Sequence, residues 1–494
     1  MKKSLGVLIC IFFLFCLFSA EEISTTNRSV ARLSSLEGDV FLQRASAMDF
    51  ENAVLNMPVI EGDRLGTTNG RAELHITRGK YIRLNHNTKI DILELPSDSS
   101  DIAQIRIWAG NCYLRVNHLD QERGVEIHTP DLSAYILDRG LYRFDIRENQ
   151  ETEIFVFQGL LETALENGSV MIKAEQRIEA IDGHATTDPT PFLSTAEDSF
   201  DRWNEQRDYI LRRETDIRYL PNELADFETE LAESGRWDTI SPYGHVWIPT
   251  GLGTSWRPYF NGRWIWLSLT GWTWLPYENW GWVTSHYGRW QWSAGYDWFW
   301  IPTNVWGPAW VNWYSGPDYW AWSPLSYDGY PAQTIPIQSR ALTVVRKDQL
   351  QAPQLARVAL NPTGLRNVGL VTLAGQEQPG RPESASRMRT PYKTRPADRG
   401  IERRNINRNM VYPSSSSIRS KRSRLQNSGR SGSTLGKIYS RIGRTSSTVK
   451  NPTTSTRRNI PTRSVIRSST SRPGSMRAPS RSSGSTSKKK VRKK

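Results

Sequence analysis

The sequence predicts a mainly β protein with an N-terminal β-sandwich or roll, a short helical linker, a Trp-rich β-repeat domain and a disordered basic tail. Three observations predict this class. Residues 32–181 alternate apolar and polar side chains with a period of two, as strands do. Residues 247–322 repeat a Trp-rich pattern with a period of 26. From about residue 375 onward Ser, Thr, Arg, Pro and Gly dominate, a composition that buries too little apolar surface to fold.

Residues 1–20 have the pattern of an export signal. Lys2-Lys3 precede an apolar run from Leu5 to Phe18, and Ser19-Ala20 follow it. The 14 residues of this run are too few for an ordinary membrane-spanning helix. We therefore expect an exported protein of the periplasm or cell envelope. An uncleaved anchor remains an alternative, because Phe18 is bulky for the position three before the cut.

Residues 30–182 are expected to form the N-terminal β domain. Short alternations such as Ala72, Leu74 and Ile76 are separated by Gly-containing turns, and no helical pattern intervenes. Cys112 is the only cysteine outside the signal, so it closes no intrachain disulfide and is expected as a buried thiol.

The turns of this domain carry a recurring set of Gly, Asp and Thr positions. They are Gly38-Asp39-Val40, Glu61-Gly62-Asp63-Arg64-Leu65-Gly66-Thr67, Arg71-Ala72-Glu73-Leu74, Gly79, Leu84, Gly110, Thr129-Pro130, Gly140-Leu141-Tyr142 and Gly159. This pattern resembles the FecR-like domain over roughly residues 30–182. The resemblance implies a location in the periplasm or outside the cell. The founding members sense a transporter and signal through an inner-membrane segment to a sigma factor. This sequence departs from them, because no cytoplasmic helical domain precedes its apolar run.

Residues 192–235 change to the three-to-four spacing of helices. Asp198 or Ser199 is the expected N-cap of a first helix, and Pro221 begins a second helix that ends at Gly235. We expect both helices to pack against one of the β domains; binding of a partner is the alternative.

Residues 236–330 are expected to form a Trp-rich domain of 26-residue repeats. The stretch from Trp247 to Trp322 holds 17 of the 20 tryptophans, and a shift of 26 places Trp264 on Trp290. Within each repeat the tryptophans occur in pairs two residues apart, so in a strand both rings point to one face. Each repeat should therefore form a short β-hairpin or meander that stacks on the next.

Several motifs of this region resemble a Trp-rich domain of unestablished activity that often follows FecR-like domains in bacterial envelope proteins. They are Phe200-Asp201-Arg202-Trp203, Trp247-Ile248-Pro249, Trp256-Arg257-Pro258-Tyr259, Gly262-Arg263-Trp264, Gly271-Trp272-Thr273-Trp274 and His286-Tyr287-Gly288-Arg289-Trp290. The match covers about residues 200–330.

Most of these rings must belong to a core. Seventeen exposed indoles would show an apolar surface on the order of 3,000 Å², far above the few hundred Å² of a typical monomer. A minority is expected to line a face that holds sugar rings or an extended chain, with envelope polysaccharide or peptidoglycan as the hypothetical partner. We expect Arg257, Arg263 and Arg289 to stack on Trp faces. The candidate ligand-binding residues are Trp256, Trp264, Trp282, Trp290, Arg263, Arg289, His286 and Tyr287.

Motifs for catalysis, cofactors and metals are not found in the sequence. HExxH, GxSxG, a nucleotide-binding loop and a Cys ligand set are missing from it. A Glu278 and Asp297 pair could serve glycoside hydrolysis in principle, but neither residue lies in a recognisable motif. We expect a non-enzymatic protein without a cofactor, with a carbohydrate-active enzyme as the most distant alternative.

The positive charge is concentrated at the C-terminus. From Arg403 onward there are 25 Lys and Arg and no Asp or Glu, and subtracting these 25 charges from the net charge of +14 leaves −11 for the rest. Residues 331–374 should be a partly ordered linker and residues 375–494 a disordered tail. The tail would bind anionic envelope polymers or lipid headgroups, whereas nucleic acid is not expected after export. A solvated tail without a dedicated partner is the alternative.

These features predict an exported, non-enzymatic binding or scaffold protein of the bacterial cell envelope. The alternative is a FecR-type sensing or signalling component that acts on a membrane partner. The oligomeric state remains open.

Overall fold

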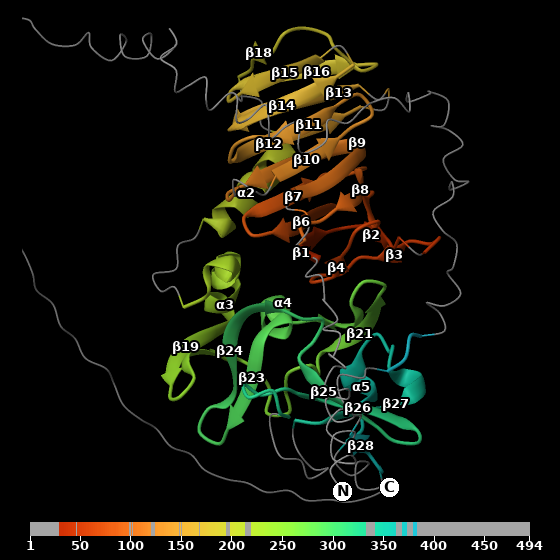
Figure 1. Cartoon of the computed structure of the whole chain (residues 1–494), viewed down its shortest axis with the longest axis vertical. Helices are drawn as coiled ribbons and strands as arrows, with labels where there is room; N and C mark the ends of the chain where they lie inside the picture. Colours follow the sequence, from red (N-terminus) through yellow and green to blue (C-terminus); the bar gives the residue numbers. More distant parts are fainter. Residues whose placement is uncertain are drawn as a thin grey trace, which may run out of the picture. The chain divides into compact units, whose positions relative to one another are not determined.

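The computed structural model confirms the mainly β prediction (Figure 1). The predicted signal at 1–20 and the predicted tail, apart from residues 379–382, lie outside the described residues. Within the described ranges, no helix is long and apolar enough to cross a membrane. The structure describes residues 29–382 except 46, 98–99, 101, 120–123, 148, 150, 167, 194–197, 213–218, 332–340, 362–367 and 373–378.

The N-terminal β domain consists of two sheets that share one long strand, β9 (Ile102–Val116). The first sheet has the order β4 (Pro58–Val59), β1 (Ala31–Glu37), β6 (Arg71–Thr77), β7 (Lys80–Leu84), β9, β12 (Gly140–Ile146), β13 (Thr152–Gln158) and β16 (Gln176–Ile181), with β17 (His184–Ala185) and β18 (Thr190–Pro191) beside β16. The second has the order β3 (Glu51–Asn52), β2 (Val40–Gln43), β5 (Arg64–Thr67), β8 (Lys89–Glu94), β9, β10 (Gly124–His128), β11 (Ser133–Ile136), β14 (Leu160–Leu165) and β15 (Gly168–Lys173).

Strand β9 passes from one sheet to the other at Gly110. Its C-terminal half pairs with β7 and β12, and its N-terminal half pairs with β8 and β10. Gly110 has φ +90°, and a Cβ there would lie 2.6 Å from the Cα of Thr88, so only glycine fits. The alternating apolar residues of both sheets form one buried core, which includes the free thiol of Cys112.

The helices follow the predicted spacing. Helix α2 (Ser199–Leu211) has Asp198 as its N-cap, and a second helical segment begins as the 3-10 helix η1 (Asn222–Phe227) and continues as α3 (Glu228–Ser234). Phe200 and Trp203 of α2 are buried together with Tyr113 of β9. Helix α2 therefore packs against the N-terminal β domain.

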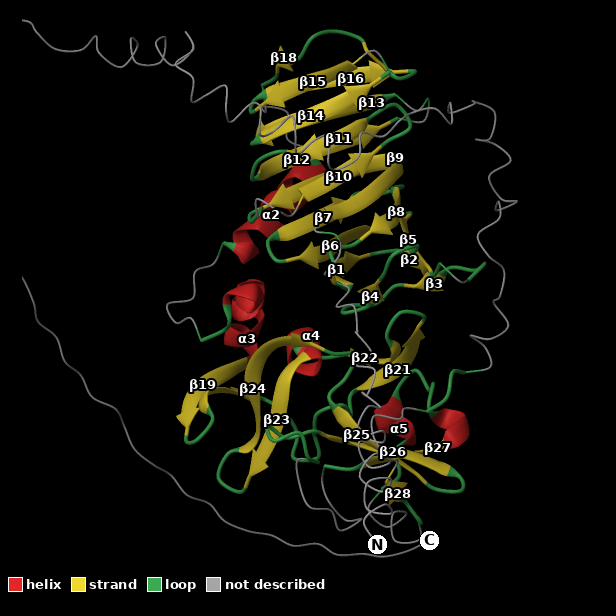
Figure 2. Cartoon of the chain, viewed as in Figure 1, coloured by secondary structure: helices red, strands yellow, loops and turns green. Residues whose placement is uncertain are grey.

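Strand hairpins make up most of the Trp-rich domain (Figure 2). Their side chains share one aromatic core. Its elements are β19 (Gly235–Ile240), β20 (Gly244–Pro249), β21 (Gly262–Leu267), β22 (Gly271–Pro276), α4 (Gly281–His286), β23 (Tyr287–Ser293), β24 (Asp297–Trp306), β25 (Val311–Ser315), β26 (Tyr319–Pro324), β27 (Thr343–Arg346), η2 (Lys347–Gln349), α5 (Leu355–Val358) and β28 (Val371–Thr372). They form the sheets β19-β20-β24-β23, β21-β22 and β27-β26-β25-β28.

Two hairpins of this domain have the same register, 26 residues apart. In β21-β22, Trp264 faces Trp274, and in β23-β24, Trp290 faces Trp300. All four rings are buried, and each contributes roughly 5 kcal/mol of apolar burial before the entropy cost of ordering. The sequence repeat is thus a repeat of cross-strand indole pairs.

Candidate functional site

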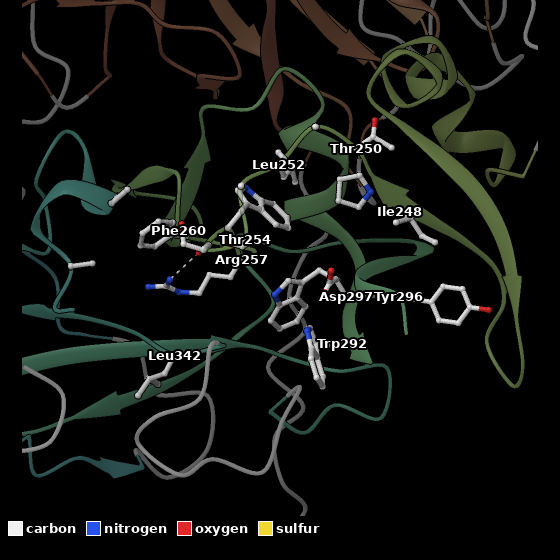
Figure 3. A pocket seen from close by; sticks show the side chains of 18 of the residues that line it. Ile248, Thr250, Leu252, Thr254, Arg257, Phe260, Trp292, Tyr296, Asp297 and Leu342 are labelled. Carbon is white, nitrogen blue, oxygen red and sulfur yellow. Dashed lines mark hydrogen bonds between the residues drawn. The ribbon is translucent and has the colours of Figure 1, made fainter. Parts of the chain in front are cut away.

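The Trp-rich domain contains a cavity of about 840 Å³, within the size range of small-molecule sites (Figure 3). Three segments form it. The loop after β20 contributes residues 250–257, the β23-β24 hairpin contributes its turn, and residues 356–361 around α5 close it together with Leu342. The cavity therefore depends on chain far from the repeat in sequence.

Two tryptophans of the cavity wall are only partly buried. The indole N–H of Trp256 donates to Glu278 Oε1 at 2.7 Å, and its ring packs against Trp280 and Trp290. Among the described residues, Trp292 forms no ring pair. These two rings line the cavity and keep part of their surface accessible.

Arg257 is the most deeply buried charged residue of the cavity wall. Its Nε donates to Thr343 Oγ1 at 2.9 Å, its Nη1 donates to the carbonyl of Ser255 at 3.3 Å, and its guanidinium lies 3.8 Å from the centroid of Phe260. Burial lowers the pKa of Arg257 to about 10. No acidic side chain of the described residues lies within ion-pair distance of it.

The other polar groups of the cavity are more exposed. Arg236 forms an ion pair with Asp238 at 2.9 Å, and Asp297 is exposed at the start of β24. Thr250, Thr254 and Ser255 add backbone and hydroxyl groups to the same wall. The cavity thus combines aromatic faces with a few hydrogen-bonding groups, as ligand sites do.

Of the eight predicted ligand-binding residues, only Trp256 lines the cavity. Trp264, Trp282, Trp290 and His286 are buried in the aromatic core. Their burial follows from the repeat itself, because the inward faces of successive hairpins pack on one another.

The predicted arginine stacking is right for Arg289 and wrong for two others. Arg289 lies over Trp310 at 3.4 Å, whereas Arg257 lies over Phe260. Arg263 has no aromatic ring beneath it within the described chain, and its nearest acid is Glu51 at 3.9 Å. The predicted residue Tyr287 is partly buried and packs against the aromatic core.

Sequence reasoning missed most of the cavity wall. Phe260, Trp292, Tyr296 and Trp298 line it, and Leu342 joins them from outside the repeat. One signal was present in the sequence: a shift of 26 places Arg257 on Val283, so a charged residue replaces a buried apolar one.

The titratable residues considered for catalysis do not converge on the cavity. Asp297 lines it, but Glu278 instead accepts the Trp256 N–H, and burial raises the pKa of Glu278. His286 donates through Nδ1–H to the carbonyl of Gly307 at 2.9 Å, and burial lowers the pKa of His286 to about 4. In the part of the chain that the structure describes, no group of three or more His, Cys, Asp or Glu could hold a metal ion.

Models of known protein families match both β domains. Residues 63–162 match the family described as FecR protein, and residues 228–329 match the family of unknown function DUF6600. The chain combines a FecR-like domain with a DUF6600 domain. The N-terminal β domain is the FecR-like domain, and the Trp-rich domain that holds the cavity is the DUF6600 domain.

Two solved structures are also similar to part of the chain. Both are crystal structures, at 2.50 and 1.65 Å resolution, of a candidate anti-sigma factor from Parabacteroides distasonis ATCC 8503. Each is 14% identical, with a TM-score of 0.23, and the match covers 26% of this chain and 59% of the solved chain. The chain thus spans 59% of the length of these structures. No curated protein matches it.

The FecR-like domain holds a buried charge network beneath α2. Arg83 of β7 pairs with Glu73 at 2.8 Å and with Asp208 of α2 at 2.7 Å. Arg207 of α2 also pairs with Glu73, and Arg115 of β9 pairs with Asp208. Glu73 faces two guanidinium groups, and Asp208 faces three, since Arg212 lies 3.2 Å from it. The network therefore fixes α2 on the sheet.

A chain of hydrogen bonds connects the cavity of the DUF6600 domain to the FecR-like domain. Trp256 donates to the Glu278 carboxylate, and the Glu278 carbonyl accepts from Asn56 Nδ2 at 2.7 Å. Asn56 Oδ1 accepts from Arg32 at 3.2 Å, and Arg32 pairs with Glu230 of α3. One continuous set of polar contacts therefore joins a cavity residue to β1 of the FecR-like domain.

Proposed function

We propose that the chain is a non-catalytic sensing component of the bacterial envelope. Its DUF6600 domain binds an envelope polymer, and its FecR-like domain acts on a membrane partner. The match of residues 63–162 to the FecR protein family carries this proposal. The resemblance to FecR-like domains implies sensing, with a signal that passes through an inner-membrane segment. The proposed location is the periplasm or cell envelope, after export directed by residues 1–20.

The polar contacts between the domains support a sensing role. A ligand that moves the Trp256 ring acts on Glu278, whose backbone carbonyl holds Asn56 of the FecR-like domain. Asn56 is buried and has φ +62°, so its position is tightly defined. Coupling between sites needs such a physical connection, and binding at the cavity can bias the FecR-like domain through it.

The basic segment from Arg403 onward adds a second attachment in this proposal. Its 25 positive charges without an acid would hold the chain to anionic envelope polymers or lipid headgroups. Such attachment is non-specific and weakens with salt, so it would concentrate the chain at the envelope without selecting a ligand.

The proposal is tested by transcription in the bacterium that produces the protein. The FecR-like domain exposes two large apolar side chains before β3, Met48 at 82% and Phe50 at 52%. If this surface contacts the partner, deletion of the gene changes a discrete set of transcripts and Phe50→Asp reproduces that change. Tyr330→Asp, at a 73% exposed residue of the DUF6600 domain, is the matched control and leaves the transcripts unchanged.

A scaffold that holds envelope polymer without passing a signal is the second candidate. The aromatic cavity favours it, because ligand binding there needs no partner for the FecR-like domain. Unchanged transcripts after deletion, together with envelope polymer that co-sediments with the purified chain, would overturn the sensing role and support the scaffold.

A further inference from the structure

The cavity holds a positive charge, that of Arg257, which forms no ion pair with an acidic side chain of the described residues. Arg257 donates hydrogen bonds through Nε and Nη1, and no residue of the described chain accepts a hydrogen bond from its Nη2. Partial burial of an unpaired guanidinium costs free energy. A bound anion would offset that cost and satisfy the fork of donors that arginine presents.

The repeat shows that this arginine is a departure from the pattern. The equivalent residue one repeat later is Val283, which is fully buried in the aromatic core. Arg257 instead lies against Phe260 at the cavity wall (Figure 3). Val283 lies in α4 and Arg257 in the loop after β20, so the cavity wall departs from the repeat in structure as well as in sequence.

Each of the two accessible indoles differs from its repeat equivalent, Trp292 in its ring contacts and Trp256 in its burial. Trp266, the equivalent of Trp292, packs edge-on against Trp272 at 5.6 Å, whereas Trp292 has no such ring contact among the described residues and lines the cavity. Trp282, the equivalent of Trp256, is buried. Flat aromatic faces that remain accessible in a wall suit the C–H faces of a pyranose ring, which stack on indoles.

We propose that this cavity binds a saccharide that carries a carboxylate, such as a uronate-containing glycan. The carboxylate pairs with Arg257, a sugar ring packs on Trp292 and Trp256, and the exposed carboxylate of Asp297 accepts hydrogen bonds from hydroxyl groups. This inference deepens the polymer-binding part of the proposed function and does not depend on signalling by the FecR-like domain.

Titration of the purified full-length chain with defined oligosaccharides tests the proposal. The probes are α-linked galacturonate and β-linked mannuronate trisaccharides, each with its carboxyl-reduced neutral counterpart. Tryptophan fluorescence is the readout, because no Trp follows Trp322 and binding of an acidic sugar to the basic C-terminal segment leaves the indoles unaffected. We expect a saturable change with at least one acidic probe, and binding of its neutral counterpart weaker by about tenfold or more.

Three variants locate the binding. Arg257→Met raises the Kd of the acidic probe by about tenfold and removes the preference over the neutral one. Trp292→Ala weakens binding of both probes by about tenfold, because it removes the stacking face. Trp266→Ala, at the equivalent position of the other repeat, binds like the unmodified chain.

Thermal melts show whether each variant is folded, so a loss of binding is separable from a loss of structure. The proposal is overturned if neither acidic probe binds more tightly than its neutral counterpart. Acid-selective binding that survives both Arg257→Met and Trp292→Ala in folded protein also overturns it. These experiments measure binding and not transcription, so their outcomes do not decide the proposed sensing role, which the transcript measurements test separately.

Discussion

His286 is a buried imidazole between two indoles, Trp282 and Trp306. Its pKa is about 4 in the folded chain and 6.5 when unfolded, because burial disfavours the charged ring. Below pH 6.5 the unfolded chain takes up a proton that the folded chain does not. The stability contributed by neutral His286 is therefore complete above pH 6.5 and is lost as the pH falls to 4, by about 3 kcal/mol.

His286→Gln should flatten this pH dependence, since an amide can donate to the Gly307 carbonyl but does not titrate. Urea unfolding followed by tryptophan fluorescence between pH 4 and 7.5 measures the effect in the DUF6600 domain, which holds 18 of the 20 tryptophans: Trp237 and the 17 between Trp247 and Trp322. Parallel pH profiles for the variant and the unmodified chain would contradict the explanation.

The stability that Glu73 contributes is lost at lower pH than the stability that His286 contributes. Burial alone would raise its pKa, but the Arg83 and Arg207 guanidinium groups outweigh burial and hold it at about 2. The stability it contributes is therefore present above pH 4.5 and is lost as the pH falls from 4.5 to 2. Glu73→Gln leaves buried guanidinium charge unpaired and should cost about 3–5 kcal/mol of unfolding free energy.

A matched control for Glu73→Gln is Glu151→Gln. Glu151 also pairs with an arginine, Arg147 at 2.8 Å, but the pair lies at the surface. Water already solvates Arg147, whose side chain is 51% exposed, so this substitution leaves stability nearly unchanged. If chemical unfolding gives the same loss of free energy for both substitutions, the charge network under α2 contributes no more to stability than a surface ion pair.

At the scale of elements, the side chain of Asp198 caps the N-terminus of α2. Asp198 accepts hydrogen bonds from the backbone N–H groups of Phe200 and Asp201, and the Asp201 side chain accepts from the Asp198 N–H, which completes a capping box. Asp198→Ala should destabilise the helix by about 1 kcal/mol. Faster hydrogen exchange in the first turn of α2 would report it.

Asp198→Asn separates the cap from the ion pair that Asp198 makes with Arg143. Asparagine caps a helix as well as aspartate does, so the exchange rates should stay near those of the unmodified chain. Fast exchange in both variants would assign the effect to the ion pair instead.

The elements show what the sequence could predict. The pairing of Trp264 with Trp274 and of Trp290 with Trp300 follows from local spacing, because strand periodicity alone decides which rings share a face. The cap at Asp198 follows from local hydrogen bonding in the same way. Such features depend on neighbours a few residues away.

The cavity and the charge network could not be predicted in that way. Leu342 reaches the cavity wall from outside the repeat, and Asp208 meets Arg83 across 125 residues. Local spacing does not predict these contacts, because tertiary packing determines them. The departure of Arg257 from its repeat equivalent Val283 was the one local sign that a wall of the repeat is specialised.

At the scale of the whole molecule, Asn56 is a buried polar side chain that links the two β domains, in addition to the ion pairs Arg32–Glu230 and Arg263–Glu51. It accepts from Arg32 and donates to the Glu278 carbonyl, and it is 1% exposed. Buried polar groups without partners are costly, so these contacts favour one fixed arrangement of the linked residues. Domains that share such contacts should unfold together.

Asn56→Gly tests this coupling, because glycine keeps the left-handed backbone at φ +62° and removes only the side-chain contacts. We expect the loss of about 2–3 kcal/mol of unfolding free energy and the separation of one calorimetric transition into two, as the domains lose the buried link through Asn56. Asn87→Gly is the control, since Asn87 has φ +49° but lies exposed. If Asn56→Gly melts in one transition at the temperature of this control, the two domains are not coupled through Asn56, and a signal from the cavity would need another route.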